Sequence, residues 1–263
     1  MNHKSKHTTL RFSAAAPGYS EAVDIQRVAA HGVLEMLATV PPAKRIVDLG
    51  CGTGILTRLL AAQFPASEVH GVDNSEAMLQ RARKETAQDA RIVWHVADAA
   101  SFCGAGTFDL AASSSSLHWM GPLSRLFANT MQLLSEGGQF VFSIMLDGTL
   151  GELHDLRRHL VPAKNPTARL PDAHEVLSSL GESGFHVESH RTEVVKVTYA
   201  SARDMLATLH KQGVTGGAVS RGKAPLTRRD LTRLERSYDA LYTLPDGGVY
   251  ASFTVLFCRA VTS

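Results

Sequence analysis

The sequence predicts an α/β fold in which a doubly wound, mostly parallel sheet carries a helical lid inserted before the last strand. Three features predict it. Short apolar runs alternate with amphipathic segments through the first 146 residues, a glycine-rich turn joins the first run to a helix, and a long helical stretch separates the last two strands. Strands that alternate with helices form βαβ units, and such units build parallel sheets.

The first predicted strand begins at Arg45 and ends in a turn before an amphipathic helix that starts at Ile55. The turn holds one acid, one cysteine and three glycines, namely Asp48, Gly50, Cys51, Gly52 and Gly54. Glycine accepts positive φ and has no Cβ, so a ligand can approach the bare backbone. The spacing differs from the dinucleotide pattern G-x-G-x-x-G, and no Gly-Lys-Ser/Thr follows, which excludes a Walker A loop. A carboxylate at Asp48 repels a pyrophosphate and suits a cationic ligand, although a short glycine-rich turn also occurs by chance.

The second predicted strand, residues 68–73, ends in Asp73, which lies 23 positions after Gly50. In nucleotide-binding βαβ units, an acid at this strand tip accepts hydrogen bonds from ribose hydroxyls. A predicted helix follows, with Ser75 as its N-cap and Met78 on its apolar face.

The remaining elements continue the alternation. The third predicted strand, residues 91–96, leads into Asp98, which fits a ligand contact or a helix N-cap equally well. The later elements are strands at 108–113, 138–144, 185–199 and 249–261, helices at 122–134, 148–161 and 173–180, and at least two helices within 201–244. Ligands of such sheets bind at the carboxyl ends of the strands. One crevice is therefore expected to collect the following strand ends: residues 48–54, Asp73, Asp98 and residues 113–119.

Composition and cysteine content are those of an ordinary folded protein. The 263 residues are 44% hydrophobic and 20% charged, with a polar N-terminus and no run of 18 apolar residues, so neither a membrane span nor a signal segment is expected. Three widely spaced cysteines fit reduced thiols, and Cys51 is interpreted as a packing residue. The histidines lack carboxylate or cysteine companions at metal-ligand spacing. The sequence predicts a cytoplasmic protein without a metal site.

The stretch before the last strand is basic. Residues 201–236 hold eight basic and three acidic side chains, a net charge of +5, which leaves −3 for the rest of a chain whose total is +2. A basic face on a lid indicates an acidic partner or an anionic substrate, although each single residue also fits a solvated helix face. Arg221 stands between Ser220 and Gly222, so we expect it to reach inward and hold a carboxylate with its planar guanidinium group.

The glycine turn with Asp48 and Asp73 resembles the cofactor motifs of the class I S-adenosylmethionine-dependent methyltransferases, which share a seven-stranded Rossmann-like fold. A narrower resemblance, to the malonyl-acyl-carrier-protein O-methyltransferases of biotin synthesis, runs from Phe12 to the C-terminus. The residues that carry it are Asp24, Gln26, Asn165 and the segments 12–19, 115–119, 147–154, 209–215 and 226–231. Residues 209–214 and 244–250 depart from the family pattern, which affects the expected substrate contacts more than the cofactor site.

The resemblance implies a binding site for S-adenosylmethionine. The expected cofactor-binding residues are Tyr19, Gln26, Asp48, Gly50, Cys51, Gly52, Gly54, Asp73, Asn74, Met78, Asp98, Ala99 and Ser114. Among them, Asp98 is expected to hold the adenine amino group, and Tyr19 and Gln26 to close over the cofactor. Trp119 and Arg221 are expected to bind the substrate. The expected positioning residues are Tyr19, His118 and Trp119, of which Tyr19 and Trp119 also fit core aromatics.

The implied reaction transfers the sulfonium methyl group to the free carboxylate of a malonyl thioester on an acidic acyl carrier protein. The products are a methyl ester, which enters biotin synthesis, and S-adenosylhomocysteine. An ionised carboxylate is already nucleophilic, so the enzyme has mainly to align the reacting groups and exclude water. We expect a monomer that uses no nucleic acid, membrane or metal.

Four parts are predicted along the chain. Residues 1–40 form a helical segment that closes over the cofactor, residues 41–200 the cofactor-binding core, residues 201–244 the helical lid, and residues 245–263 the final core strand.

Three other functions stay open. A small-molecule carboxylate or metabolite methyltransferase uses the same cofactor site without an acidic protein partner. A nucleic-acid methyltransferase is disfavoured because four serines, residues 113–116, stand where an Asn-Pro-Pro-Tyr motif would follow the fourth strand. A non-catalytic S-adenosylmethionine-binding module is the third, although Asp48 and Asp73 are both present.

Overall fold

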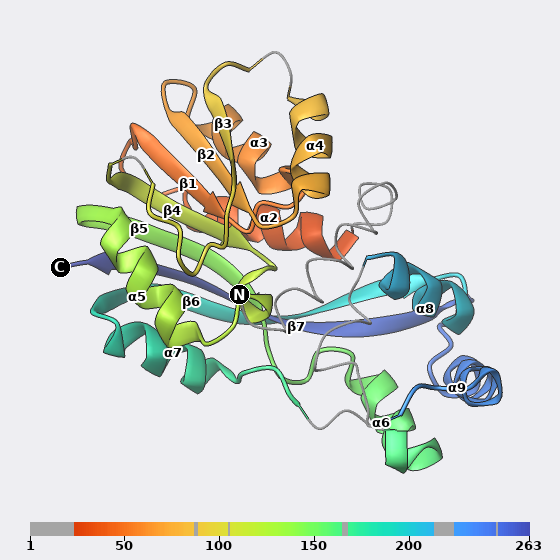
Figure 1. Cartoon of the computed structure of the whole chain (residues 1–263). Helices are drawn as coiled ribbons and strands as arrows, with labels where there is room; N and C mark the ends of the chain where they lie inside the picture. The colour runs from red at the N-terminus through yellow and green to blue at the C-terminus, as the bar shows by residue number, and fades with distance from the viewer. Residues whose placement is uncertain (1–23, 87–88, 105, 165–167, 213–223, 246) are drawn as a thin grey trace.

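The computed structural model describes residues 24–86, 89–104, 106–164, 168–212, 224–245 and 247–263, which form a sheet with helices on both faces (Figure 1). The strands of the sheet are β1 (Arg45–Leu49), β2 (Glu68–Asp73), β3 (Ile92–Val96), β4 (Phe108–Ser114), β5 (Leu134–Met145), β6 (Phe185–Tyr199) and β7 (Val249–Thr262). Their order is β3-β2-β1-β4-β5-β7-β6, and β7 alone runs against its neighbours. This order confirms the predicted doubly wound, mostly parallel sheet.

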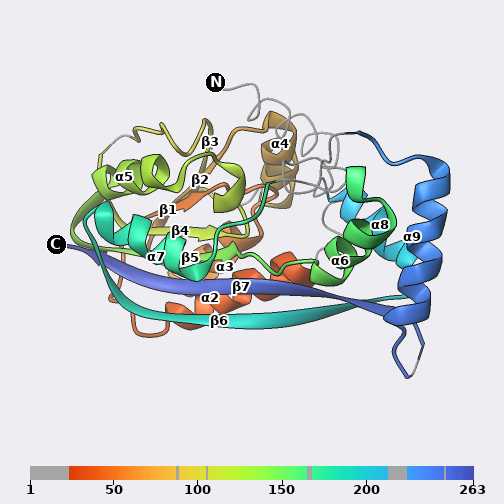
Figure 2. The same cartoon turned by 90° about the horizontal axis from the view of Figure 1, so that it is seen from below.

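Two groups of helices cover the sheet, as Figure 2 shows from below. On one face lie α2 (Asp24–Met36) and α3 (Ile55–Gln63), and on the other α5 (Leu123–Leu133) and α7 (Ala173–Glu182). Each strand contributes side chains to the apolar cores on both faces of the sheet, because successive side chains in a strand point to opposite sides. In β1, Ile46 packs in the α2–α3 cluster and Val47 in the α5–α7 cluster, and both are fully buried.

The helix α4 (Glu76–Glu85) packs on β2 and β3 near the edge of the sheet. Its N-cap is Ser75, whose hydroxyl accepts a hydrogen bond from the backbone N–H of Met78. The predicted cap and the buried position of Met78 are thereby confirmed.

A second apolar core lies beside the sheet and forms what we call the helical extension. It is built by α6 (Gly151–Leu160), α8 (Ala202–Lys211), α9 (Arg228–Leu241) and the far ends of β6 and β7. Leu156, Met205 and Tyr238 are buried in it. An ion pair of 2.7 Å between Lys164 and Asp230 joins the 3-10 turn η3 (Pro162–Lys164) to α9. The extension therefore uses α6, which precedes β6 in the chain, as well as the two predicted helices of residues 201–244.

Most element bounds agree with the sequence prediction within a few residues. The clearest difference is β5, which begins at Leu134, four residues before the predicted strand at 138–144. Leu134 pairs with Phe108 across a register shift, so the strand gains a partner there that its local sequence does not reveal. No helix in the described ranges combines the length and the apolar character that a membrane crossing requires.

Candidate functional site

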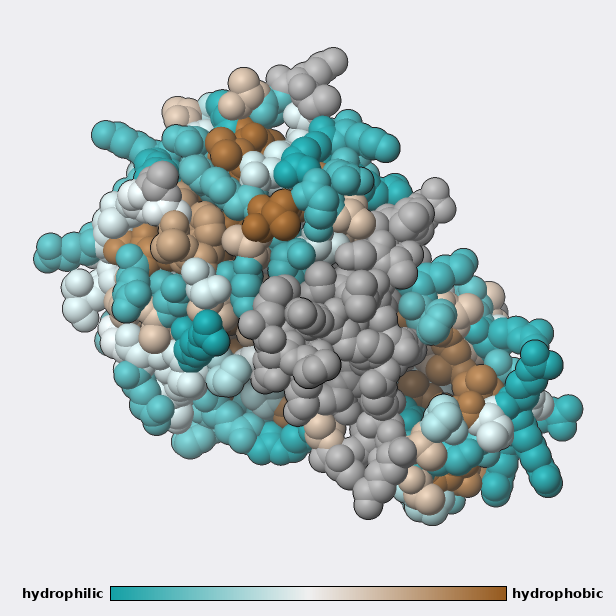
Figure 3. Space-filling model, in the orientation of Figure 1, coloured by the Kyte–Doolittle hydropathy of each residue, from teal (hydrophilic) through white to brown (hydrophobic). Residues whose placement is uncertain are grey.

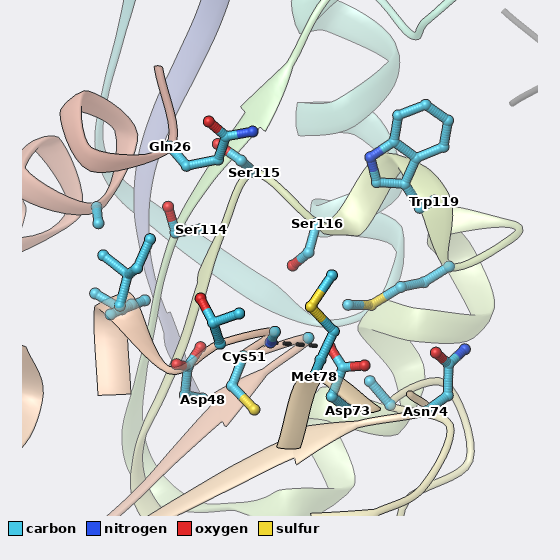
Figure 4. A pocket seen from close by; sticks show the side chains of 18 of the residues that line it. Gln26, Asp48, Cys51, Asp73, Asn74, Met78, Ser114, Ser115, Ser116 and Trp119 are labelled. Carbon is cyan, nitrogen blue, oxygen red and sulfur yellow. Dashed lines mark hydrogen bonds between the residues drawn. The ribbon is translucent and has the colours of Figure 1, made fainter. Parts of the chain in front are cut away.

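A pocket opens at the carboxyl ends of β1, β2 and β4 (Figure 4). Its lining comprises Gln26, Ala30, Asp48, Gly50, Cys51, Gly52, Thr53, Ile55, Leu56, Asp73, Asn74, Met78, Ala97, Asp98, Ala99, Ser114, Ser115, Ser116, Trp119 and Met120. The predicted crevice is therefore present. The strand ends meet here because parallel strands all terminate at the same edge of the sheet.

The three glycines of the turn have different tasks. All have positive φ, at 73°, 55° and 78° for Gly50, Gly52 and Gly54. A Cβ on Gly50 would lie 2.1 Å from the Cε of Met120, and one on Gly54 would lie 2.7 Å from the indole of Trp94. A Cβ on Gly52 would meet nothing within 4 Å. Gly50 and Gly54 thus permit close packing of the protein, whereas Gly52 borders open space in the pocket.

Asp48 lies at the base of the pocket with one oxygen paired and one unpaired. Its side chain is 1% exposed, and Oδ2 accepts a hydrogen bond of 2.6 Å from the Thr57 hydroxyl. Oδ1 has no hydrogen-bond partner among the described residues. Burial, reinforced by the nearby charge of Asp73, raises the pKa of Asp48 to about 7. A cationic group bound beside Oδ1 would supply the missing partner and favour the ionised carboxylate.

Two further acids lie toward the end of the pocket where Asn74 is found. Asp73 accepts hydrogen bonds from the backbone N–H groups of Gly52, at 2.9 Å, and Ser75, at 2.8 Å, while burial raises its pKa. Asp98 accepts a hydrogen bond of 3.0 Å from the N–H of Ala100. No helix follows Asp98 within the described residues 97–104, so it is not a helix N-cap. Both carboxylates are held by backbone and keep lone pairs that hydroxyl or amino groups of a ligand can use.

The opposite end of the pocket is formed by α2 and by the segment after β4. Figure 4 shows Gln26, Ser115 and Trp119 there, away from Asp73 and Asn74. Gln26 Oε1 and Ser115 Oγ are buried and have no hydrogen-bond partner in the described part of the chain.

His118 and Gly54 differ from the other described candidates because neither lines the pocket. The ring of His118 packs against Trp119 with 4.8 Å between ring centroids. Burial lowers the pKa of His118 to about 3, so the imidazole is neutral at physiological pH. Of the two adjacent positioning candidates in the 3-10 turn η2 (Leu117–Trp119), Trp119 lines the pocket, whereas the imidazole of His118 packs against the indole and is not part of the lining.

Eight lining residues were not named individually as site candidates, although three of them lie in the segments 48–54 and 113–119 that were predicted to meet at the crevice. They are Ala30, Thr53, Ile55, Leu56, Ala97, Ser115, Ser116 and Met120. Ala30 could have been found because it lies one helical turn after Gln26, and Thr53 because it stands within the glycine turn. Tyr19 and Arg221 lie outside the described residues, as do residues 12–18 and Asn165.

Cys51 is the one thiol among the described residues that line the pocket. Burial raises the pKa of the Cys51 thiol well above its usual value, so it stays protonated. Among the described residues, no group of three or more His, Cys, Asp and Glu side chains is arranged to hold a metal ion.

Comparisons with known proteins agree with this geometry. A family model described as a methyltransferase domain matches residues 46–138. Relatives named malonyl-[acyl-carrier protein] O-methyltransferase include one from Halorhodospira halophila, 30% identical over 95% of this chain and 85% of its own length. Another, from Geobacter sulfurreducens, is 29% identical over 94% of both chains.

Solved structures share the fold at low identity. The YcgJ protein of Bacillus subtilis superposes with a TM-score of 0.61 at 14% identity and covers 88% of this chain and 98% of that one. The N-methyltransferase NodS of Bradyrhizobium japonicum, solved with S-adenosylhomocysteine, gives 0.54 at 15% identity over 95% of this chain and 98% of its own. The chain therefore belongs to the class I S-adenosylmethionine-dependent methyltransferases, and the two relatives reported above, which match most of its length, are named malonyl-[acyl-carrier protein] O-methyltransferases.

Proposed function

We propose that this protein transfers a methyl group from S-adenosylmethionine to the free carboxylate of a malonyl group on an acyl carrier protein, and that the ester enters biotin synthesis. One observation carries the proposal. Relatives named for this reaction align over 95% and 94% of the chain, and so include the helical extension as well as the methyltransferase domain at 46–138. If the similarity were confined to the sheet and its helices, it would support only the use of the same cofactor. Proteins that share a fold differ in their substrates because the substrate site is formed by segments added to that fold.

The pocket chemistry fits the cofactor. We assign the unpaired Oδ1 of Asp48 to the amino group of the methionine moiety, Asp73 to the ribose hydroxyls and Asp98 to the adenine amino group. Met78 offers an apolar wall for the adenine ring. When bound, S-adenosylmethionine supplies an electrophilic methyl group on positively charged sulfur.

The task of the chain is alignment and exclusion of water. A carboxylate acceptor is ionised at neutral pH and needs no base. The neutral His118 and the protonated Cys51 thiol therefore have no proton to move. Holding the acceptor in line with the methyl group can supply much of the rate enhancement.

The carrier partner is supported by charge on the helical extension. Arg229, Arg233 and Arg236 follow one another at helical spacing on α9 and are exposed. Figure 3 shows a hydrophilic outer rim on this part of the molecule. Arginines on such a rim attract an acidic protein over distances near the Debye length.

Arg221 remains the candidate from the sequence for capturing the acceptor's negative charge. Replacing Arg221 by Ala is expected to raise the KM for the malonyl substrate about tenfold or more, since charged hydrogen bonds are among the strong ones. The cofactor dissociation constant, measured by calorimetry, is expected to stay unchanged. An unchanged KM would remove Arg221 from this role.

Mass spectrometry of malonyl-carrier protein incubated with enzyme and cofactor tests the proposed reaction. The malonyl protein is expected to gain one methyl group, and acetyl-carrier protein, which lacks the free carboxylate, is expected to gain none. Methylation of free dicarboxylic acids without methylation of the carrier protein would indicate a small-molecule methyltransferase. No methylation of any of these acceptors would contradict the proposal.

A further inference from the structure

Four consecutive serines, residues 113–116, span the end of β4, and their hydroxyl groups make different contacts. Ser113 donates to the carbonyl oxygen of Leu49 at 2.7 Å, and Ser116 reaches the same oxygen at 3.1 Å. The Ser114 hydroxyl accepts a hydrogen bond of 3.4 Å from Ser143. Ser115 Oγ is buried and has no partner among the described residues, although it borders the pocket.

The backbone of Ser115 is held in a conformation that serine seldom adopts. Its φ is 52°, in the left-handed region. Its N–H is fixed by Ser143, with the carbonyl oxygen at 3.1 Å and the hydroxyl at 3.3 Å. A non-glycine residue with positive φ is strained, and such strain gathers at functional sites. Here the strained residue is also the one whose hydroxyl is left without a partner inside the pocket.

Gln26 brings a second unpaired polar group to the same end of the pocket. It lies in the first turn of α2, lines the pocket, and its Oε1 is buried without a partner in the described part of the chain. Gln26 and Ser115 line the same pocket, and in the view of Figure 4 both are drawn on the side away from Asp73 and Asn74. Buried polar groups without partners are uncommon in folded proteins, and each calls for an explanation. The two together describe a site for an external polar group.

We propose that Ser115 and Gln26 form a subsite for the acceptor carboxylate. The serine hydroxyl donates one hydrogen bond to it, and the Gln26 amide donates another when it is turned so that Nε2 takes the buried position of Oε1. This subsite rests on the proposed function for its acceptor, a carboxylate at the end of a thioester chain. It assigns Gln26 to the acceptor in place of the cofactor contact that the sequence led us to expect. Both donors are neutral. They orient the reacting carboxylate oxygen, which is a separate task from the capture of the acceptor's negative charge that is proposed above for Arg221.

Neutral donors suit the charge balance of the transfer. One carboxylate oxygen forms a bond to the methyl carbon while the carbon–sulfur bond breaks and its electron pair stays on sulfur. The negative charge of the carboxylate and the positive charge of the sulfonium both disappear, and no proton moves. Interactions that favour the charged ground state over the transition state slow such a step, whereas orientation at low polarity assists it. Ser115 is a catalytic residue in this account because it touches the reacting group.

Two variants of Ser115 separate its hydroxyl from its backbone strain. Ser115→Ala removes the hydroxyl and keeps the strain, and Ser115→Gly removes both. Both are expected to lower kcat/KM for malonyl-carrier protein about 10- to 100-fold, the effect of one hydrogen bond to a charged group. Ser179→Ala is the matched control, because Ser179 Oγ is also buried without a described partner but lies on α7 outside the pocket. Its kinetics are expected to match those of the parent protein.

A binding measurement provides a second readout that is independent of turnover. The thioester S-malonyl-N-acetylcysteamine is titrated calorimetrically into protein saturated with S-adenosylhomocysteine. The parent protein and Ser179→Ala are expected to bind it, and Ser115→Gly and Gln26→Leu to bind it at least about tenfold more weakly. The affinity of all four proteins for S-adenosylhomocysteine is expected to stay equal.

The outcomes separate this subsite from the proposed function. If the parent protein does not methylate malonyl-carrier protein, the proposed function is wrong. The subsite is tested separately, by the affinity of the parent and variant proteins for the small thioester. If Ser115→Gly keeps the parent's affinity for the small thioester and the parent's turnover, the proposed subsite is wrong. An equal loss of affinity for S-adenosylhomocysteine would also contradict it, because that loss would place the two side chains in the cofactor site.

Discussion

At the scale of single residues, the carboxyl group of Asp48 combines burial, one hydrogen bond from Thr57 and one oxygen that has no partner in the described part of the chain. Its pKa is raised to about 7. A bound cation favours the ionised form, so binding at neutral pH releases a proton. We expect affinity for S-adenosylmethionine to rise with pH from about 6 to 8 and then to level off. Titration calorimetry across this range, in buffers of different ionisation enthalpy, measures both the affinity and the proton release.

The variant Asp48→Asn provides the control for this pH dependence. Its affinity is expected to be at least about tenfold weaker at pH 8 and to vary little between pH 6 and 8. An equally steep pH dependence in Asp48→Asn would assign the titration to another group.

The same group links stability to pH in the protein alone. The folded state holds the Asp48 proton more tightly than the unfolded chain does, because the folded pKa is raised from 3.8 to about 7. The stability from this group is complete below the unfolded value and is lost as the pH rises through the folded one. Asp48→Asn is therefore expected to stabilise the protein alone at pH 8 by on the order of 1–3 kcal/mol. Denaturant unfolding without ligand tests this, and a destabilised variant would contradict it.

At the scale of elements, the glycine turn between β1 and α3 offers a comparison of two alanine substitutions. In Gly54→Ala the new Cβ meets Trp94 at 2.7 Å, so the free energy of unfolding is expected to fall by about 2–4 kcal/mol. In Gly52→Ala the Cβ meets no protein atom within 4 Å, and the backbone strain alone is expected to cost about 1–2 kcal/mol. Its affinity for S-adenosylmethionine is expected to fall at least about tenfold, because the Cβ enters space assigned to the ligand.

Denaturant unfolding and calorimetric titration distinguish the two effects. Normal cofactor affinity in Gly52→Ala would show that the ligand does not occupy the space beside the turn.

At the scale of the whole molecule, the helical extension places exposed arginines on α9 outside the sheet. The double variant Arg229→Glu/Arg236→Glu is expected to lower kcat/KM for malonyl-carrier protein about tenfold or more at low salt, since like charges then oppose docking. The effect is expected to shrink at high ionic strength. Turnover of a small malonyl thioester by the same variant is expected to stay normal, because that substrate has no acidic protein surface.

Kinetic assays with both substrates check this, with Lys44→Glu/Lys84→Glu as the matched control. That variant makes the same change of charge at exposed positions before β1 and in the last turn of α4. An equal loss with the carrier protein in both variants would assign the effect to net charge and not to α9.

The sequence by itself determined the architecture and the acidic end of the pocket. Strand and helix periodicity and glycine spacing are local properties, so they predicted the order of elements and the meeting of Asp48, Asp73 and Asp98 at one edge of the sheet. The four-part division of the chain and the ligand roles of individual residues stay predictions.

Only the tertiary structure decided which side chains are unsatisfied and where they point. The raised pKa of Asp48, the Ser115 hydroxyl that has no partner among the described residues, and the position of His118 outside the pocket lining depend on packing from distant segments. So does the sharing of one core by α6 and α9, which stand on either side of β6 in the chain. Burial and hydrogen bonding are set by neighbours in space, and no periodicity in the chain encodes which of four adjacent serines is left without a partner.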